Sequence, residues 1–399
     1  MLLRKMAVLT ITAAMVSGAG CVDDGEDGAR GPAGAAGAPG DKGDPGEPGE
    51  PGPKLAPPAV YTLANAVAGN EVASYLRATN GNLSRAGRFA TGGTGMGGGI
   101  GSQGALVFDA KLQRFFAVNP GNHTISMLAI DADGKLTSMS TVASGGVTPV
   151  SLAVHGDLVY VANRGAFTGA TSAPNISGFR VQGATLVPIA GSTKPLSAST
   201  DVRPTNLGFS PDGKHVIVVE RLANRVDTFT LTDGVAGNGN FQLSAGLQPF
   251  AFDFSPEGHL IVAEVGDGTA TGSTASSYAI SAQGTLIPIT SALPTLQGAA
   301  CWIAVAGGFA YIANTATANV TGLVIADDGS LTLRDASGVT ATTGAGAIDL
   351  AVAPDRGYLY SLAGNPRAIH TFSIAADGGL TALAPLSNVS PTAVGLVAR

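Results

Sequence analysis

The sequence is poor in the residues that build metal centres, disulfide frameworks and nucleophilic sites. Only five of its 399 residues are histidine and only two are cysteine. The histidines are scattered, and no two have the spacing of metal ligands, so we predict no metal site. No Gly-x-Ser-x-Gly elbow is present, and no serine has a neighbouring histidine that could activate it. We therefore expect neither a bound cofactor nor a serine nucleophile.

Positive charge is also in deficit. The 22 Lys and Arg residues against 28 Asp and Glu residues leave a net charge of −6. A protein that binds nucleic acid presents a basic face, so the charge balance argues against this class of partner. No long amphipathic helix is visible. Gly, Thr, Ala, Val, Asn and Ser dominate the body of the chain, a composition typical of short strands joined by turns.

The first 20 residues have the pattern of an export signal. Arg4 and Lys5 precede an apolar run, 6–16, that is too short to span a bilayer. The small residues of "SGAGC" predict cleavage after residue 20 and lipid attachment to Cys21, with 21–24 as the lipidated start. Ordinary secretory cleavage nearby is the alternative. No later segment is long and apolar enough to cross a membrane, so we expect an exported protein, lipid-anchored to a bacterial membrane at the cell surface or in the periplasm.

The two cysteines have different predicted fates. If Cys21 carries lipid, no intramolecular disulfide can form in the mature chain. Cys301 lies in the apolar strand pattern "GAACWIAV". This setting predicts a buried, inert thiol rather than a nucleophile.

Residues 25–54 form a collagen-like segment. Glycine stands at every third position from Gly25 to Gly52, and proline takes many of the places between. Only glycine fits at the axis of three wound chains, so this period is the signature of a collagen triple helix. Two interpretations stay open: a homotrimeric stalk, or a monomeric extended spacer of roughly 3 Å per residue.

Residues 55–399 repeat one strand pattern seven times. Each copy is followed by a turn glycine and then closely by Leu or Val, as in "ADGKL" and "DDGSL". The Asp-Gly and Asn-Gly pairs of these turns supply the positive φ that a two-residue hairpin needs. Seven units of roughly 45 to 57 residues predict an all-β, seven-bladed β-propeller. The terminal "SPTAVGLVA" would complete the first blade and close the ring. The seven copies are "AVYTLAN", "RFFAVNPGN", "LVYVANRG", "HVIVVERLAN", "HLIVAEVGD", "FAYIANTATAN" and "YLYSLAGNP".

Polar residues gather at one end of the predicted blades. The first strand of a blade lines the central channel and the second runs antiparallel to it, so the start of the first meets the end of the second. A channel mouth with several Arg, Glu and amide groups suits a small anionic ligand. An alternative is that these charges hold the blades together by ion pairs. The candidate ligand-binding residues are Gln103, Arg164, Arg203, Asn206, Arg221, Gln248, Glu264 and Arg367, with Glu220 as the candidate catalytic residue.

A glycine-rich stretch, "GGTGMGGGIGSQG" at 92–104, contains the GxGxxG spacing. No strand–helix–strand unit surrounds it, and no lysine follows as in a phosphate loop. We therefore expect a flexible loop that leads into the second blade.

The segments "GSQGALVFDAKLQRFFAVNPGNHTISML", "FSPDGKHVIVVERLANRVDTF" and "AACWIAV" resemble the lactonase-like seven-bladed propellers, which include 6-phosphogluconolactonase and the carboxymuconate cyclases. "AYIANTATANVTGLVI" also resembles the YVTN-type repeats of surface propellers. The resemblance implies histidines, an arginine and a glutamate at the mouth. Here Thr205 and Asn206 stand where an Arg-His pair is expected. Arg221 takes the place of the glutamate, and Glu220 lies one residue before it.

This departure favours binding over catalysis. We expect an exported protein that binds a small anionic or sugar-like ligand, or a surface protein, at the channel mouth. The alternative is an active lactonase-type hydrolase or cyclase on a sugar-acid or dicarboxylic lactone. Glu220 would then be the base, and Arg203 and Arg221 would hold the anion. An arginine beside Glu220 would lower its basicity, which is why binding is the leading hypothesis.

Overall fold

The computed structural model describes residues 31–40, 55–166, 172–344, 346–364 and 367–399. The chain divides into two compact units, Met1–Gly52 and Pro53–Arg399. In the first unit, 31–40 are exposed and have no regular secondary structure. The predicted signal segment, Cys21 and most of the predicted stalk lie outside the described residues. Among the residues that are described, none forms a helix of the length and apolarity needed to traverse a bilayer.

The second unit is built from seven antiparallel sheets, which we call blades 1 to 7. Their strands have the following bounds: blade 1, β1 (Ala59–Leu63), β2 (Glu71–Arg77), β3 (Leu83–Ala90) and β31 (Val394–Ala398); blade 2, β4 (Leu106–Asp109), β5 (Arg114–Asn119), β6 (Thr124–Ile130) and β7 (Leu136–Ala143); blade 3, β8 (Pro149–His155), β9 (Leu158–Asn163), β10 (Asn175–Gln182), β11 (Thr185–Pro188) and β12 (Lys194–Pro195); blade 4, β13 (Pro204–Phe209), β14 (His215–Glu220), β15 (Arg225–Thr232) and β16 (Val235–Leu243); blade 5, β17 (Pro249–Phe254), β18 (Leu260–Glu264), β19 (Thr274–Ile280) and β20 (Leu286–Pro294); blade 6, β21 (Ala300–Ala306), β22 (Phe309–Asn314), β23 (Asn319–Ile325), β24 (Leu331–Leu333) and β25 (Ala341–Thr342); blade 7, β26 (Ala347–Val352), β27 (Tyr358–Ala363), β28 (Ala368–Ile374), β29 (Leu380–Ala382) and β30 (Leu386–Ser387).

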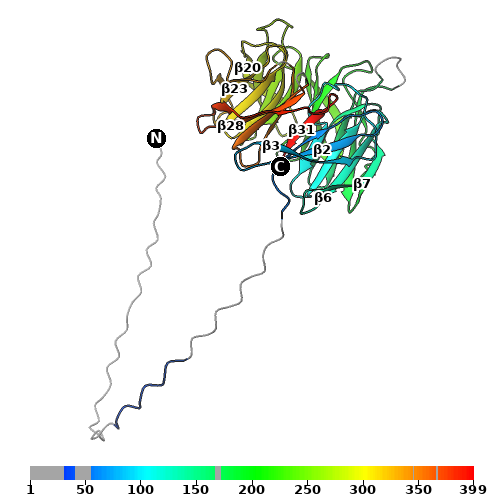
Figure 1. Ribbon diagram of the computed structural model, residues 1–399. Helices are drawn as coiled ribbons and strands as arrows, with labels where there is room; N and C mark the ends of the chain where they lie inside the picture. Colours follow the sequence, from blue (N-terminus) through cyan, green and yellow to red (C-terminus); the bar gives the residue numbers. More distant parts are fainter. Residues whose placement is uncertain (1–30, 41–54, 167–171, 345, 365–366) are drawn as a thin grey trace, which may run out of the picture. The chain divides into compact units, whose positions relative to one another are not determined.

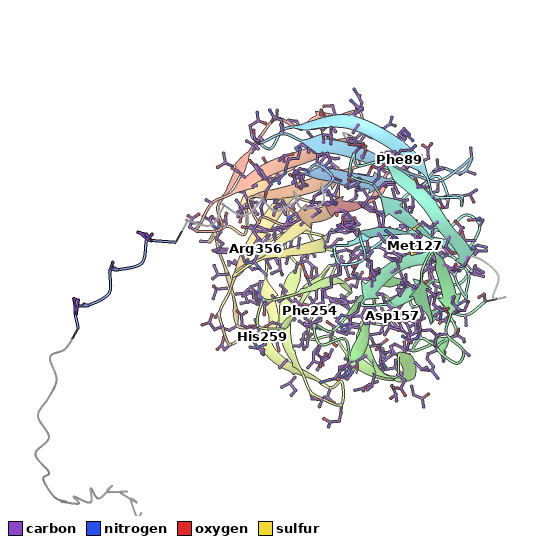
Figure 2. The ribbon with its side chains drawn as sticks, turned by 90° about the horizontal axis from the view of Figure 1, so that it is seen from below. Phe89, Met127, Asp157, Phe254, His259 and Arg356 are labelled. Atoms are coloured by element: carbon purple, nitrogen blue, oxygen red, sulfur yellow. The ribbon has the colours of Figure 1, made fainter. Side chains whose placement is uncertain are left out.

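The blades follow one another around a ring in chain order, which the sequence colours show in Figure 2. In blades 2 to 7 the strands pair as a meander, and the first strand of each blade packs against the first strands of its neighbours around the central channel. The described part of the chain contains strands and no helix. The prediction of an all-β, seven-bladed β-propeller is therefore confirmed.

The two ends of the propeller meet in blade 1. The C-terminal strand β31 pairs antiparallel with β1, with Val60 opposite Ala398 and Thr62 opposite Leu396. In Figure 1 the red β31 accordingly lies beside the blue strands of blade 1. The innermost strand of this blade thus comes from the far end of the sequence. This pairing removes the open blade edge that a linear array would leave.

The second strand of each blade is buried on both faces because blades pack face to face. β14 is buried along all its residues, which explains the unbroken apolar run in the sequence. The preceding turn is set by its own side chains: Ser210 Oγ donates to Asp212 at 2.7 Å, and Gly213 N donates to Ser210 O at 2.8 Å. The "SPDG" repeat therefore specifies where one strand ends and the next begins.

Buried tyrosines connect neighbouring blades. The Tyr160 hydroxyl of blade 3 donates to Gly234 O at 2.8 Å and accepts from Ala236 N at 2.9 Å, both in blade 4. The Tyr311 hydroxyl of blade 6 makes the corresponding bond to Gly378 O of blade 7 at 2.9 Å. Each hydroxyl satisfies backbone groups of the next hairpin turn, so the contact fixes the angle between blades as well as adding packed area.

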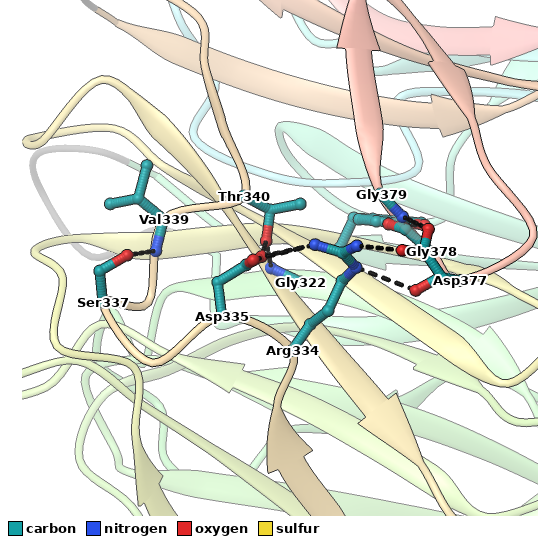
Figure 3. A network of polar contacts seen from close by, with 10 residues as sticks. Gly322, Arg334, Asp335, Ser337, Val339, Thr340, Asp377, Gly378 and Gly379 are labelled. Atoms are coloured by element: carbon teal, nitrogen blue, oxygen red, sulfur yellow. Dashed lines mark hydrogen bonds and ion pairs between the residues drawn. The ribbon is translucent and has the colours of Figure 1, made fainter.

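An ion-pair network joins blades 6 and 7 at their outer edge (Figure 3). The Arg334 guanidinium lies 2.9 Å from Asp335 and 2.9 Å from Asp377, and its Nε donates to the Asp377 carbonyl at 2.9 Å. Asp377 belongs to the β28–β29 turn of blade 7. The pairs are partly exposed, so each contributes modestly to stability. Ion pairs of this kind are one way in which the blades are held together.

Candidate functional site

The channel mouth is the end of the central channel at which the innermost strands begin. Arg203 immediately precedes β13 and Arg221 immediately follows β14. Because these strands are antiparallel, the two residues meet, and Arg221 N donates to Arg203 O at 3.1 Å. Arg164 follows β9 in the neighbouring blade. Blades 3 and 4 thus bring three of the predicted ligand-binding arginines to one place. We call Arg164, Arg203, Arg221 and Asp201 the arginine cluster.

One carboxylate organises this cluster. Asp201 accepts from Arg164 Nε at 3.2 Å and Nη2 at 2.5 Å, and from the backbone N–H of Arg203 at 2.9 Å. Burial acts to raise the pKa of Asp201, but the hydrogen bonds and charge of Arg164 lower it overall. Asp201 is therefore ionised at neutral pH. The cluster holds three positive charges and this one negative charge.

Arg203 is the least satisfied member of the cluster. Its side chain is half-buried, and burial together with the charges of Arg164 and Arg221 lowers its pKa. Its Nε is buried and has no hydrogen-bond acceptor among the described residues. A buried guanidinium donor without an acceptor is costly. An anion that accepted from this guanidinium would relieve both the unmet donor and the repulsion between the arginines.

The backbone at Arg203 is left-handed, with φ of 54°. The same conformation recurs directly before the innermost strand of blades 3, 5 and 6, at Thr148 (φ 56°), Gln248 (φ 54°) and Ala299 (φ 56°). Four unrelated side chains share it, so the strained turn belongs to the repeat and not to ligand binding. Its effect is to place residue 203 and residue 248 at equivalent points around the mouth.

Arg221 is positioned by blade 5. Its Nε and Nη2 both donate to Gln248 Oε1, at 3.1 and 3.0 Å. Gln248 is held in turn, because its Nε2 donates to Gly266 O at 3.1 Å. The Arg221 guanidinium also lies 5.9 Å from the centre of the Phe250 ring. Gln248 and Phe250 therefore orient Arg221, and Gln248 acts through this arginine.

The two candidate glutamates are sealed inside the blades. Glu220 and Glu264 have no exposed surface. Glu220 accepts from the backbone N–H of Ser197 at 2.9 Å and from its hydroxyl. A general base must come within about 3 Å of the proton it removes. In this conformation neither carboxylate reaches a ligand in the mouth.

Glu264 is bound on every side. It accepts from Ser244 Oγ at 2.9 Å, Gly246 N at 2.8 Å, Thr274 Oγ1 at 2.5 Å and Ser276 Oγ at 2.8 Å. Burial nevertheless raises its pKa above the ordinary value. These bonds tie two strands of blade 5, β18 and β19, to the linker 244–246 before the blade, so the role of this carboxylate is structural.

Glu220 has a second carboxylate as its neighbour. Asp227 of β15 is fully buried, and its Oδ2 has no donor among the described residues. Burial and the interaction with Glu220 raise the pKa of Asp227 to about 10. Two buried carboxyl groups in contact cannot both ionise, so Asp227 keeps a proton and donates it to Glu220. The sequence alone did not reveal this pair, because only the β14–β15 register places the two side chains together.

The glycine-rich segment crosses the channel. Gln103 pairs with the backbone of Ile303 in blade 6, donating from Nε2 to O and accepting at Oε1 from N, both at 3.0 Å. On the other side, Gln103 N donates to Thr205 O at 2.8 Å, and Asn206 Nδ2 donates to Gln103 O at 3.4 Å. Gln103 and Asn206 are thus brought into contact with each other. The expected flexible loop instead ends as a hydrogen-bonded bridge between blades, which we call the channel bridge (102–104).

The channel bridge separates two cavities. On the mouth side is a cavity of about 220 Å³, which we call the mouth pocket, lined by Gly99, Ile100, Gly101, Ser102, Trp302, Ile348 and Val394. Beyond the bridge is a cavity of about 330 Å³ that contains Asp253 and Asp349. Burial raises the pKa of Asp253 to about 6 and that of Asp349 well above its usual range. No sequence motif marks either acid as a site residue.

Arg367 is the last of the predicted ligand-binding residues. Arg367 is exposed, and its side chain makes no hydrogen bond or ion pair with the described residues. His123 is exposed, and its Nδ1 accepts from Thr148 N at 3.1 Å. No group of three or more His, Cys, Asp or Glu that could hold a metal ion occurs within the described ranges. Asp201, Phe250 and Trp302 belong to the mouth, although sequence reasoning passed over them. For Asp201, its place two residues before Arg203 was the available signal.

No protein-family model matches the chain, and no curated protein is similar to it. Solved structures are similar in fold. A structure of a putative 6-phosphogluconolactonase from Bacteroides uniformis is 18% identical, with a TM-score of 0.66 over 86% of this chain and 99% of that one. The periplasmic gluconolactonase PpgL of Pseudomonas aeruginosa is 16% identical, with a TM-score of 0.65 over 85% and 99%. A protein from Lactobacillus plantarum is 16% identical, with a TM-score of 0.67 over 86% and 100%. The chain therefore shares the seven-bladed β-propeller fold of these structures.

Proposed function

We propose that this propeller binds a small anion, a carboxylate or phosphate such as that of a sugar acid, in the arginine cluster at the channel mouth. The observation that carries the proposal is the gathering of three arginines from two blades, of which Arg164 pairs with Asp201 while Arg203 interacts electrostatically with both Arg164 and Arg221. Arginine matches the geometry of carboxylate and phosphate, and its charge-assisted hydrogen bonds are among the strongest in proteins. An anion would complete the charge balance of this cluster.

The burial of the two candidate glutamates favours binding without turnover. Glu220 and Glu264 have no exposed surface and are committed to donors within the protein. Lactone hydrolysis needs a base that reaches a water molecule or the substrate. The printed names of the similar structures, putative 6-phosphogluconolactonase and periplasmic gluconolactonase, support the alternative that this chain hydrolyses a lactone. Turnover of a panel of sugar-acid and dicarboxylic lactones, lost in Glu220→Gln, would establish that alternative.

The binding proposal is tested by isothermal titration of the protein with gluconate and 6-phosphogluconate. Arg203→Gln removes the guanidinium whose Nε lacks an acceptor. We therefore expect the affinity for the anion to fall roughly 10- to 100-fold, which corresponds to the loss of one charge-assisted hydrogen bond. Arg88→Gln is the matched control, because Arg88 pairs with Glu71 in the outer strands of blade 1. Equal affinities in all three proteins would contradict a role for the arginine cluster.

We also propose that the propeller is exported and anchored by lipid on Cys21. The support is the sequence pattern of 1–20 and the "SGAGC" segment. The Cys21→Ala variant is expected to leave the membrane fraction of the cells that produce it. Retention of this variant in the membrane would contradict the anchor.

The collagen-like segment is the proposed source of oligomerisation. The strict glycine period of 25–54 supports a homotrimeric stalk, and a trimer would present three mouths at once. Light scattering should give a trimeric mass for the intact protein and a monomeric mass after deletion of 25–54. A monomeric mass before the deletion would identify the segment as a spacer.

A further inference from the structure

The mouth pocket is apolar and lies at the same end of the channel as the arginine cluster. Its walls come from Ile100, Trp302, Ile348 and Val394, with backbone of the glycine-rich segment between them. Ile100, Trp302 and Val394 are only 4%, 7% and 6% exposed, whereas Gly99 and Gly101 at the edge of the pocket are exposed. None of these side chains carries a charge. The pocket therefore offers a different environment from the arginines at the same end of the channel.

Aromatic contacts connect the two environments. The Arg221 guanidinium lies 5.9 Å from the centre of the Phe250 ring. The Phe250 ring in turn packs edge-on against Trp302, with centroids 4.7 Å apart. Trp302 forms a wall of the mouth pocket. Phe250 thus lies between the Arg221 guanidinium and the Trp302 wall of the mouth pocket.

The two polar side chains at the pocket, Trp302 and Ser102, are already paired. Trp302 Nε1 donates to Ser102 O at 3.0 Å, and Ser102 Oγ donates to Val150 O at 2.7 Å. A polyhydroxylated group would lose its hydration here and find few partners, which is costly. An aliphatic or aryl group would lose only unfavourable contact with water. A cavity of about 150 Å³ lined by apolar side chains holds benzene, and the mouth pocket has about 220 Å³.

We infer that the ligand of this propeller is an amphipathic anion, a carboxylate or phosphate that carries a short alkyl chain or one aryl ring. The headgroup binds the arginine cluster and the apolar part fills the mouth pocket. This inference rests on the proposed anion site and narrows its ligand class from sugar acids to acids with an apolar tail. It also assigns Trp302 and Ile348 as specificity-determining residues.

The experiment uses a ladder of inorganic phosphate and butyl, hexyl and octyl phosphate. Trp302 is the only tryptophan of the chain, so its fluorescence reports on the mouth pocket, while titration calorimetry gives the affinity. Burial of one methylene corresponds to roughly a fourfold gain in affinity. We expect affinity to rise along the ladder until the pocket is full, with a change in Trp302 emission that inorganic phosphate does not cause.

Two variants distinguish the contribution of the headgroup to the affinity from that of the apolar tail. Ile348→Thr should remove most of the gain from chain length and leave the affinity for inorganic phosphate unchanged. Arg203→Gln should weaken binding of every member of the ladder. The matched control for the first variant is Ile287→Thr, since Ile287 is 52% exposed on the outer strand β20; it should behave as the unmodified protein.

The outcomes are distinguishable. Phosphate or 6-phosphogluconate binding with no dependence on chain length would overturn the inference and leave the proposed anion site standing. A gain from chain length that persists in Ile348→Thr, without a change in Trp302 emission, would also overturn it, because the tail would then bind elsewhere. If no anion binds at all, the proposed function itself fails and the inference fails with it.

Discussion

The buried pair of Glu220 and Asp227 makes the stability of the propeller depend on pH in a way that one substitution should remove. Asp227→Asn keeps the shape of the side chain and keeps an N–H that can donate to Glu220. It removes the proton that the folded protein binds and the unfolded chain releases. Burial and the contact with Glu220 raise the pKa of Asp227 to about 10 in the fold, whereas an unfolded aspartate ionises near 4.

The direction in which stability changes with pH depends on whether the folded or the unfolded state holds the proton of Asp227. Between about pH 4 and about pH 10 the native state keeps Asp227 protonated and the unfolded state does not, so the free energy of unfolding falls as pH rises. The slope from one such group is about 1.4 kcal/mol per pH unit. Between about pH 6 and about pH 8 the unmodified protein should thus lose roughly 3 kcal/mol that Asp227→Asn does not lose.

Urea denaturation at a series of pH values measures this difference. Other buried acids titrate as well, Asp253 among them, so the informative quantity is the free energy of unfolding of the variant minus that of the unmodified protein. This difference should grow with pH. Asp233→Asn, on the exposed β15–β16 turn of the same blade, is the control and should give a flat difference. A flat difference for Asp227→Asn would refute the shared proton.

Three further predictions concern the scaffold. Gly104→Ala should lower the free energy of unfolding by more than the ~1–2 kcal/mol that a left-handed backbone costs a non-glycine residue. Gly104 has φ of 81°, and a Cβ there would also lie 2.8 Å from Ser151 Oγ. Thermal melts measure the change, with Gly98→Ala as the control because a Cβ at Gly98 meets nothing within 4 Å. Tyr160→Phe should cost about 1–3 kcal/mol in the free energy of unfolding, since it leaves two backbone groups of blade 4 unpaired; Tyr75→Phe, which loses a single 3.4 Å contact, should cost less. Burial raises the pKa of the Cys301 thiol to about 11, so iodoacetamide at neutral pH should label Cys301 only in urea. Rapid labelling of Cys301 itself in the folded protein, located by peptide mass, would contradict its burial.

The propeller could be predicted because each blade is a local structure. The turn signals "SPDG" and "DDGS" and the apolar second strands lie within one repeat of roughly 50 residues, and hairpin geometry follows from them directly. The antiparallel direction of successive strands also predicted that Arg203 and Arg221 lie at one end of blade 4, as the pairing of β13 and β14 shows. The sequence by itself therefore determined the blades, their number and the end of the channel at which polar residues gather.

The tertiary structure decided how those residues are used. Glu220 and Arg221 are neighbours in sequence, yet one lies inside the blade on Ser197 and Asp227 and the other reaches Gln248 of the next blade. The channel bridge depends on contacts between residues 200 positions apart, such as that of Gln103 with Ile303. No local pattern encodes such contacts, because they arise only when the ring closes and brings distant blades across the channel. Closure of the ring is thus the physical reason why the mouth pocket and the channel bridge could be found only in the folded protein, whereas the buried acid pair follows from the register of β14 and β15.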